Sequence, residues 1–351
     1  GRDIDFDDWR IVKVDYLIVG RLLPAEDGAF SIQFQVFDVL RGEQLLGYRQ
    51  PATRSNLRAV SHRVADLVSE DLTGIPGVCS TRIASVTVTG EAGQQNSRLI
   101  GAAADGANAR VLVESSAPLM SPAWSPDGRK LAYVSFESRN SAIYVQTLRS
   151  GARQRVSARA GVNSAPAWSP DGRRLALTLS RQDGNLDIYT LDLASQVLTR
   201  LTRRASIDTE ATWSPDGESL YFTSDRGGSP QVYRIAADGS GSSERVTVEG
   251  SYIARPRLSP DGRQLAVVHI DRGNYRIAGV DVAQGYTLVL TDGRLDESPS
   301  FAPNGETLIY ATREAGRGVL ATVSSDGRIK QRISALDGDV REPAWSPLPR
   351  N

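Results

Sequence analysis

Short apolar runs separated by polar turns repeat along the chain from about residue 82 to its end. In one unit, Trp124-Ser-Pro-Asp-Gly128 is followed by the runs Leu131-Ala-Tyr-Val134, Ile143-Tyr-Val145 and Gln154-Arg-Val156, with the small polar turn Arg149-Ser-Gly151 before the last run. The runs are short, rich in β-branched and aromatic residues, and bounded by Gly, Pro, Asp and Ser. This pattern predicts strands rather than helices.

The motif that opens this unit recurs at intervals of 43 to 45 residues. The anchor residues that begin the copies are Trp124, Trp168, Trp213, Leu258, Phe301 and Trp345. In the Pro-Asp-Gly turns, proline presets φ, aspartate bonds its own backbone and glycine accepts positive φ, so we interpret these aspartates as turn residues. Six copies of a four-stranded unit predict a six-bladed β-propeller built from WD40-like (PD40) repeats, and therefore a mainly β fold.

The two ends of the repeat region complement each other. Only five anchors are followed by three more strands, and three unmatched strands precede the first anchor, at 83–88, 98–100 and 109–113. We therefore expect the last anchor strand, 341–346, to complete the blade begun near residue 82, which removes an open sheet edge. The predicted propeller domain covers residues 79–351.

The first 78 residues lack the repeat. An apolar stretch at 14–23, an alternating stretch at 30–36 and a third at 44–49 predict strands, and apolar residues from Leu57 to Leu72 on one helical face predict a helix that stops near Gly74. One helix and three strands make a thin core. We expect a small α+β domain over residues 1–78 that is incomplete at its N-terminus.

Composition excludes several classes of function. The 41 basic and 41 acidic residues balance, which argues against a nucleic-acid-binding protein. The sequence contains no run of 18 apolar residues, so we expect no direct membrane span. The single Cys79 is expected to be a buried thiol, and the lone His62 and His269 show no metal-ligand spacing. No cofactor-binding motif is present, so we expect neither a cofactor nor a metal.

The residues just before each anchor are the candidate binding site. We expect them to form six loops that converge on one mouth of the central channel, where a mixture of acids, arginines and hydroxyls suits a polar protein ligand. The loop pairs are Met120-Ser121, Ser164-Ala165, Thr209-Glu210, Ala254-Arg255, Glu297-Ser298 and Arg341-Glu342. Hairpins between the second and third strands, including 137–140 and 225–228, are expected on the same face.

The chain resembles the TolB family of the bacterial Tol–Pal system. The resemblance rests on Pro118-Leu-Met-Ser-Pro-Ala-Trp-Ser-Pro-Asp-Gly128 with its continuation 131–138, on Asp71-Leu-Thr-Gly-Ile75, on Leu295-Asp-Glu-Ser-Pro299 and on 340–347. It implies a periplasmic protein whose precursor carries a signal peptide. It also implies a non-enzymatic adaptor that binds the lipoprotein Pal on the propeller face and links it to TolA and other inner-membrane Tol proteins, in support of outer-membrane integrity and cell division.

The resemblance carries over to single residues of this face. Ala165, Thr209 and Glu210 match positions that contact Pal and colicin translocation segments in the family. Val162 belongs to the same face but departs from the family pattern, because relatives carry histidine there. Because of this difference, the resemblance does not imply that the protein binds the same colicins as its relatives.

Two other interpretations remain open from the residues alone. A propeller enzyme would need acids that converge on the channel, for which Asp208, Glu210 and Asp271 are the candidates, although nothing in the sequence singles them out as a pair. A propeller associated with a serine peptidase would need a hydrolase domain, and the 351 residues contain no hydrolase nucleophile elbow.

Overall fold

The computed structural model of the chain describes residues 4–25, 28–91, 94–180, 182–333 and 336–349. Its contacts divide the chain into two compact units, Gly1–Ser80 and Thr81–Asn351. Among the described residues no helix is both long and apolar enough to cross a membrane.

The first unit is a three-stranded antiparallel sheet with two helices. Its elements are α1 (Phe6–Ile11), β1 (Tyr16–Pro24), β2 (Phe30–Asp38), β3 (Glu43–Ala52) and α2 (Leu57–Thr73). Phe34, Val36 and Leu46 form a small core with Val68 of α2, which explains the alternating pattern of β2. The helix α1 was not expected from the apolar pattern, because it buries none of its residues and begins at the capping side chain of Asp5.

Cys79 lies at the end of this unit and corrects one expectation. Its side chain is exposed, so the prediction of a buried thiol is wrong. The backbone N–H groups of Cys79 and Ser80 donate to the two carboxylate oxygens of Asp66, at 2.6 Å and 2.9 Å. The segment is therefore held through its backbone N–H groups.

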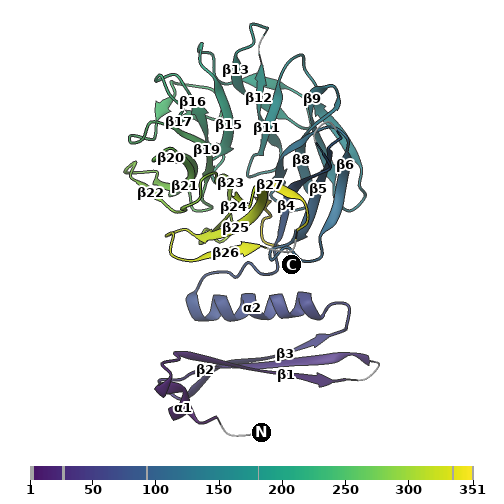
Figure 1. Ribbon diagram of the computed structural model, residues 1–351, viewed down its shortest axis with the longest axis vertical. Helices are drawn as coiled ribbons and strands as arrows, with labels where there is room; N and C mark the ends of the chain where they lie inside the picture. Colours follow the sequence, from purple (N-terminus) through teal and green to yellow (C-terminus); the bar gives the residue numbers. More distant parts are fainter. Residues whose placement is uncertain (1–3, 26–27, 92–93, 181, 334–335, 350–351) are drawn as a thin grey trace. The chain divides into compact units, whose positions relative to one another are not determined.

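The second unit is a ring of six four-stranded antiparallel sheets, so the predicted six-bladed propeller is confirmed (Figure 1). Blade 1 consists of β7 (Leu119–Trp124), β8 (Lys130–Ser138), β9 (Asn140–Thr147) and β10 (Arg153–Ser157). Blade 2 consists of β11 (Asn163–Trp168), β12 (Arg174–Ser180), β13 (Leu186–Asp192) and β14 (Leu198–Arg200). Blade 3 consists of β15 (Asp208–Trp213), β16 (Ser219–Ser224), β17 (Gln231–Ala236) and β18 (Glu244–Arg245).

The remaining blades follow the same order, and the last one joins the two ends of the unit. Blade 4 consists of β19 (Ile253–Leu258), β20 (Gln264–Asp271), β21 (Asn274–Asp281) and β22 (Thr287–Val289). Blade 5 consists of β23 (Glu297–Phe301), β24 (Thr307–Glu314), β25 (Arg317–Ser324) and β26 (Lys330–Ile333). Blade 6 consists of β27 (Asp339–Trp345), β4 (Arg82–Thr89), β5 (Asn96–Ala103) and β6 (Arg110–Ser115).

The yellow β27 lies beside the blue β4 in Figure 1, and the two strands pair antiparallel with Trp345 opposite Ile83. The chain's late segment is thus hydrogen-bonded to the strand that its early segment contributes. This pairing covers the edge of β4, which would otherwise offer unpaired backbone groups to another chain.

The anchor tryptophans connect neighbouring blades. The indole N–H of Trp168 donates to the carbonyl of Ala123 at 3.1 Å, and that of Trp213 donates to the carbonyl of Ala167 at 3.1 Å. Trp124 makes the equivalent bond to Ala344 at 3.0 Å. Each bond runs to the first strand of the preceding blade, so the repeated tryptophan is explained by packing together with a blade-to-blade hydrogen bond.

Candidate protein-binding face of the propeller

Apart from Val162, which directly precedes β11, the predicted site residues lie in the first strand of each blade, not in loops before it. Met120 and Ser121 are inside β7, for example, and Arg341 and Glu342 are inside β27. The expectation of six convergent loops is therefore wrong in its local structure, although the residues occupy equivalent places in six neighbouring strands. We call these twelve positions the rim: Met120, Ser121, Ser164, Ala165, Thr209, Glu210, Ala254, Arg255, Glu297, Ser298, Arg341 and Glu342.

A β-bulge interrupts each first strand at the rim. In β19, for instance, Ala254 is opposite Val268 and Arg257 is opposite Ala266, so three steps along β19 match two along β20. The same shift occurs in the other five first strands. Five of the six bulges contain a proline, which has no N–H to contribute to a ladder and is tolerated at such irregularities.

The second rim residue of every blade has a left-handed backbone. Its φ lies between 48° and 56° in all six blades, at Ser121, Ala165, Glu210, Arg255, Ser298 and Glu342. A residue with a Cβ pays about 1–2 kcal/mol for this conformation. Six repetitions show that the surrounding blades impose it, and strain of this kind is concentrated at functional sites.

The N–H groups turned out of the ladder by the bulges bind partners on neighbouring blades. The N–H of Glu210 donates to the hydroxyl of Thr178 at 3.1 Å, and the N–H of Arg255 donates to the hydroxyl of Thr223 at 3.0 Å. The N–H of Ser121 donates to the carboxylate of Glu342. The rim backbone is therefore tied from blade to blade and presents its side chains from a rigid frame.

Rim side chains from three consecutive blades form a chain of contacts. Arg255 is paired with Glu210 at 2.6 Å and donates to the hydroxyl of Ser298 at 2.5 Å. Burial raises the pKa of Glu342 above its usual value, although the Ser121 N–H and the charge of Arg255 act in the opposite direction. The rim thus combines a paired, positioned arginine with a carboxyl group that is reluctant to ionise.

The hairpins between the second and third strands carry ion pairs on the same side of the blades. Glu137 accepts two bonds from Arg153, at 2.7 Å and 2.8 Å, in blade 1. Glu314 pairs with Arg332 at 2.6 Å in blade 5. These pairs hold the hairpins that surround the rim, but they are partly exposed and contribute little to stability on their own.

The three acids considered for catalysis are each bound to an arginine. Asp208 accepts bonds at 2.9 Å and 3.0 Å from Arg226, and Asp271 pairs with Arg276 at 2.5 Å. Glu210 is engaged by Arg255, as described above. Each of the three carboxylates is therefore part of an ion pair. No group of three or more metal-ligating side chains occurs among the described residues.

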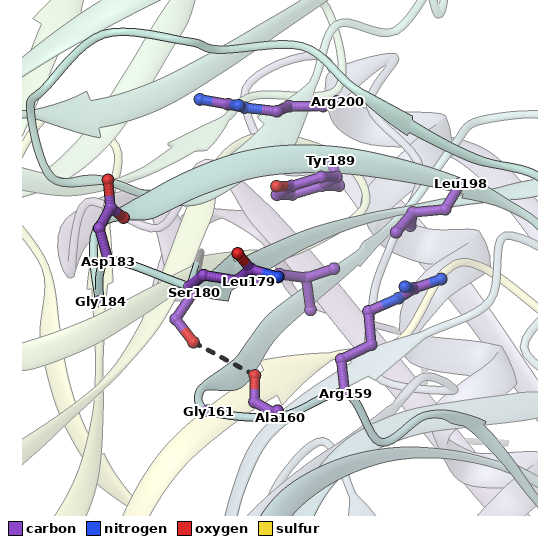
Figure 2. A pocket seen from close by; sticks show the side chains of 11 residues that line it. Arg159, Ala160, Gly161, Leu179, Ser180, Asp183, Gly184, Tyr189, Leu198 and Arg200 are labelled. Carbon is purple, nitrogen blue, oxygen red and sulfur yellow. Dashed lines mark hydrogen bonds between the residues drawn. The ribbon is translucent and has the colours of Figure 1, made fainter.

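A cavity of about 820 Å³ opens next to Val162, between the connection that leads from blade 1 into blade 2 and the outer part of blade 2. Figure 2 shows Arg159 and Arg200 in its wall together with Tyr189 and Leu198. Val162 itself is 39% exposed. The aromatic and arginine side chains of this cavity were not predicted as site residues, because no repeat position marks them.

A second, smaller cavity of about 220 Å³ lies between blades 4 and 5 on the rim side. Arg255 and Glu297 of the rim line it together with Tyr252 and Tyr275, whose rings meet edge to face with centroids 5.7 Å apart. The two tyrosines were also missed from the sequence. Aromatic side chains in such a place are typical of protein-binding surfaces.

Comparison with known proteins identifies two family models along the chain. The model described as the TolB amino-terminal domain matches residues 1–45, and the model described as the TolB beta propeller domain matches residues 69–349. The second match alone covers more than half of the chain.

Individual relatives agree with these models. A protein named Tol-Pal system protein TolB from Xanthomonas campestris pv. campestris is 52% identical over 349 residues, covering 99% of this chain and 79% of the relative. A protein of the same name from Xanthomonas oryzae pv. oryzae is also 52% identical over 349 residues, with the same coverage. The crystal structure of TolB from Acinetobacter baumannii is 42% identical, with a TM-score of 0.92 over 99% of this chain and 86% of that one.

Proposed function

This chain belongs to the TolB family and is a component of the Tol–Pal system, and on that premise we propose that it is a non-enzymatic periplasmic adaptor that binds the lipoprotein Pal on the rim. In this proposal the bound Pal is linked to TolA and other inner-membrane Tol proteins. The adaptor thereby supports outer-membrane integrity and invagination during cell division. Colicin translocation segments would compete for the same surface.

The observation that carries the proposal is the sixfold left-handed backbone at the rim. It turns equivalent side chains from all six blades around one mouth of the channel, and hydrogen bonds between blades hold them there. A surface that is already ordered loses little conformational freedom when a partner binds, so more of the contact energy is available as affinity.

The chemistry of the rim supports a protein ligand. It mixes a paired arginine, hydroxyls and a carboxyl group of raised pKa, with the tyrosines of the smaller cavity beside them. Arginine and tyrosine are enriched where proteins bind each other. The cavity beside Val162 extends this surface outward over blade 2.

Calorimetric titration with purified Pal tests the proposal. Thr209 is half-buried at the rim, and an arginine there would add bulk and charge to the proposed contact surface, so we expect Thr209→Arg to weaken Pal binding by at least tenfold. The matched control is Glu218→Lys in the same blade, at an exposed turn position after β15. We expect it to bind as the wild type does. Equal affinity of Thr209→Arg and wild type, with the fold intact, would refute the site.

The non-enzymatic part of the proposal has its own test. Hydrolase activity on peptide or ester reporter substrates is expected to be at background for the wild type. Turnover that disappears in Glu210→Gln but survives in Glu218→Gln would overturn it, because the first residue is at the rim and the second is remote from it.

A further inference from the structure

The second mouth of the channel, at the ends of the first strands, contains a cavity of about 340 Å³. Every blade contributes residues to the lining of this cavity, from its first strand or from the segment directly after it. We call the cavity the Ser-Pro mouth. Four anchor tryptophans take part in its wall: Trp124, Trp168, Trp213 and Trp345. Its volume is at the lower end of the range for small-molecule sites.

One position in the repeat determines the charge of the Ser-Pro mouth. The residue directly before the anchor is small in five blades, where it is Ala123, Ala167, Thr212, Ser300 or Ala344. In blade 4 it is Arg257, and this arginine is the single charged side chain among the residues that line the cavity. The five small residues leave open space around the guanidinium.

The guanidinium of Arg257 has few partners. Its Nη1 donates to the carbonyl of Pro256 at 2.9 Å, and no carboxylate of the described residues lies within ion-pair distance of it. Desolvation is the main influence and lowers the pKa of Arg257; Glu210 and Glu342 oppose it through longer-range attraction, while the like charge of Arg255 acts in the same direction as desolvation. A partly buried charge without a close acidic partner is costly, so a bound anion would relieve that cost.

The other residues of the wall strengthen the attraction between Arg257 and an anion, and they do not themselves bind the guanidinium. Tryptophan rings and prolines make up half of the lining residues, which lowers the local dielectric around the charge. The turn serines are already engaged, as Ser125 and Ser259 show by donating to Asp127 and Asp261 at 2.6 Å. Arg257 is therefore the group in the mouth that is able to hold a charged ligand.

We propose that the Ser-Pro mouth is an oxyanion-binding site in which Arg257 holds a carboxylate or phosphate group. Arginine presents a planar fork of N–H donors that matches both groups in a bidentate manner. The site lies at the other end of the channel from the rim and does not depend on the Pal-binding proposal.

Titration with citrate and with inorganic phosphate, at an ionic strength held constant with sodium chloride, tests this inference on the full chain. Tryptophan fluorescence is a suitable readout, because four of the five tryptophans line the mouth. We expect saturable binding with one site per chain for at least one probe, and a loss of affinity of about tenfold or more in Arg257→Gln. Citrate alone, phosphate alone or both would identify the preferred oxyanion.

The control variant is Arg129→Gln, which removes an exposed arginine from the turn after Trp124 and is expected to bind like the wild type. Arg257→Lys keeps the charge without the fork and is expected to bind with intermediate affinity. Wild type that does not bind either probe saturably, or Arg257→Gln with unchanged affinity, would overturn the proposal. The same variants are titrated with Pal, and we expect unchanged Pal affinity, because the rim is at the other end of the channel. A failure of one proposal is thereby distinguished from a failure of the other.

Discussion

Trp345 donates its indole N–H to the hydroxyl of Thr81 at 2.7 Å, a bond between residues 264 positions apart in the chain. The two residues are buried; Trp345 lies in β27, and Thr81 directly precedes β4, with which β27 pairs in blade 6. The N–H of Arg82 adds a bond to the hydroxyl of Ser346 at 2.9 Å. Closure of the ring therefore depends on side chains as well as on the strand ladder.

The first prediction concerns this closure. Trp345→Phe keeps most of the packing and loses the hydrogen bond, so we expect a loss of about 1 kcal/mol in the free energy of unfolding. Trp345→Ala also leaves a cavity and is expected to cost about 3–5 kcal/mol. Urea denaturation measures both values. Phe301 occupies the equivalent position in blade 5, so a phenylalanine fits at such an anchor. A loss in Trp345→Phe as large as that in Trp345→Ala would therefore contradict this account.

The second prediction concerns the left-handed backbone at Ala165, where φ is 48°. Ala165→Gly removes the Cβ strain of about 1–2 kcal/mol but adds about 0.5–1 kcal/mol of unfolded-chain entropy, so we expect a net stabilisation of about 0.5–1 kcal/mol. The matched control is Ala167→Gly in the same strand, which is expected to destabilise by about 0.5–1 kcal/mol. If Ala165→Gly and Ala167→Gly both lowered the free energy of unfolding, the left-handed backbone at Ala165 would not be strained.

The repeat predicted the ring because its signals are local and redundant. The anchor, the turn motif and the leucine seven residues later recur together, so even Leu258 and Phe301 were placed without a tryptophan. The pairing of β27 with β4 followed from counting strands, since a ring leaves no strand without a partner.

The bulges at the rim were not predicted, although the sequence contains a signal for them. Pro122, Pro166, Pro256, Pro299 and Pro343 follow the left-handed residues directly, and a proline inside a strand marks an irregular ladder. The tyrosines of the two rim-side cavities, and Arg159 and Arg200 of the larger one, had no such signal. Tyr252, for example, gains its meaning only through contact with Tyr275, on another strand.

The third prediction concerns the buried ion pair of blade 3. Asp208 is fully buried, and Arg226 binds both of its oxygens while lying over the rings of Phe222 and Tyr233, at 5.2 Å and 4.7 Å from the ring centroids. Arg226→Met leaves the buried carboxylate with the hydroxyl of Ser206 but without its charged partner, so we expect a loss of about 3–5 kcal/mol. Denaturation at pH 7 measures the change.

A half-exposed ion pair between an arginine and a carboxylate provides the control for this prediction. Arg332 and Glu314 are 2.6 Å apart, and their side chains are 55% and 43% exposed. Arg332→Met is expected to cost no more than about 1 kcal/mol. In the double variant Arg226→Met/Asp208→Asn, part of the stability lost at Arg226 is expected to return. If Arg226→Met and Arg332→Met cost the same, burial would not be the deciding factor.

The last prediction concerns pH and the carboxyl group of Glu342. Its pKa is raised in the folded state, mainly by burial, so the folded protein holds this proton more tightly than the unfolded chain does. The resulting stabilisation is fully present below the pKa of an unfolded glutamate, about 4.3, and is lost as the pH rises through the folded pKa. Glu342→Gln keeps an oxygen for the Ser121 N–H and removes the titration. We therefore expect its stability relative to wild type to increase between pH 4 and pH 8 in urea denaturation, whereas Glu306→Gln, at an exposed turn, controls for the lost charge. A difference between Glu342→Gln and wild type that stays constant over this range would refute the assignment.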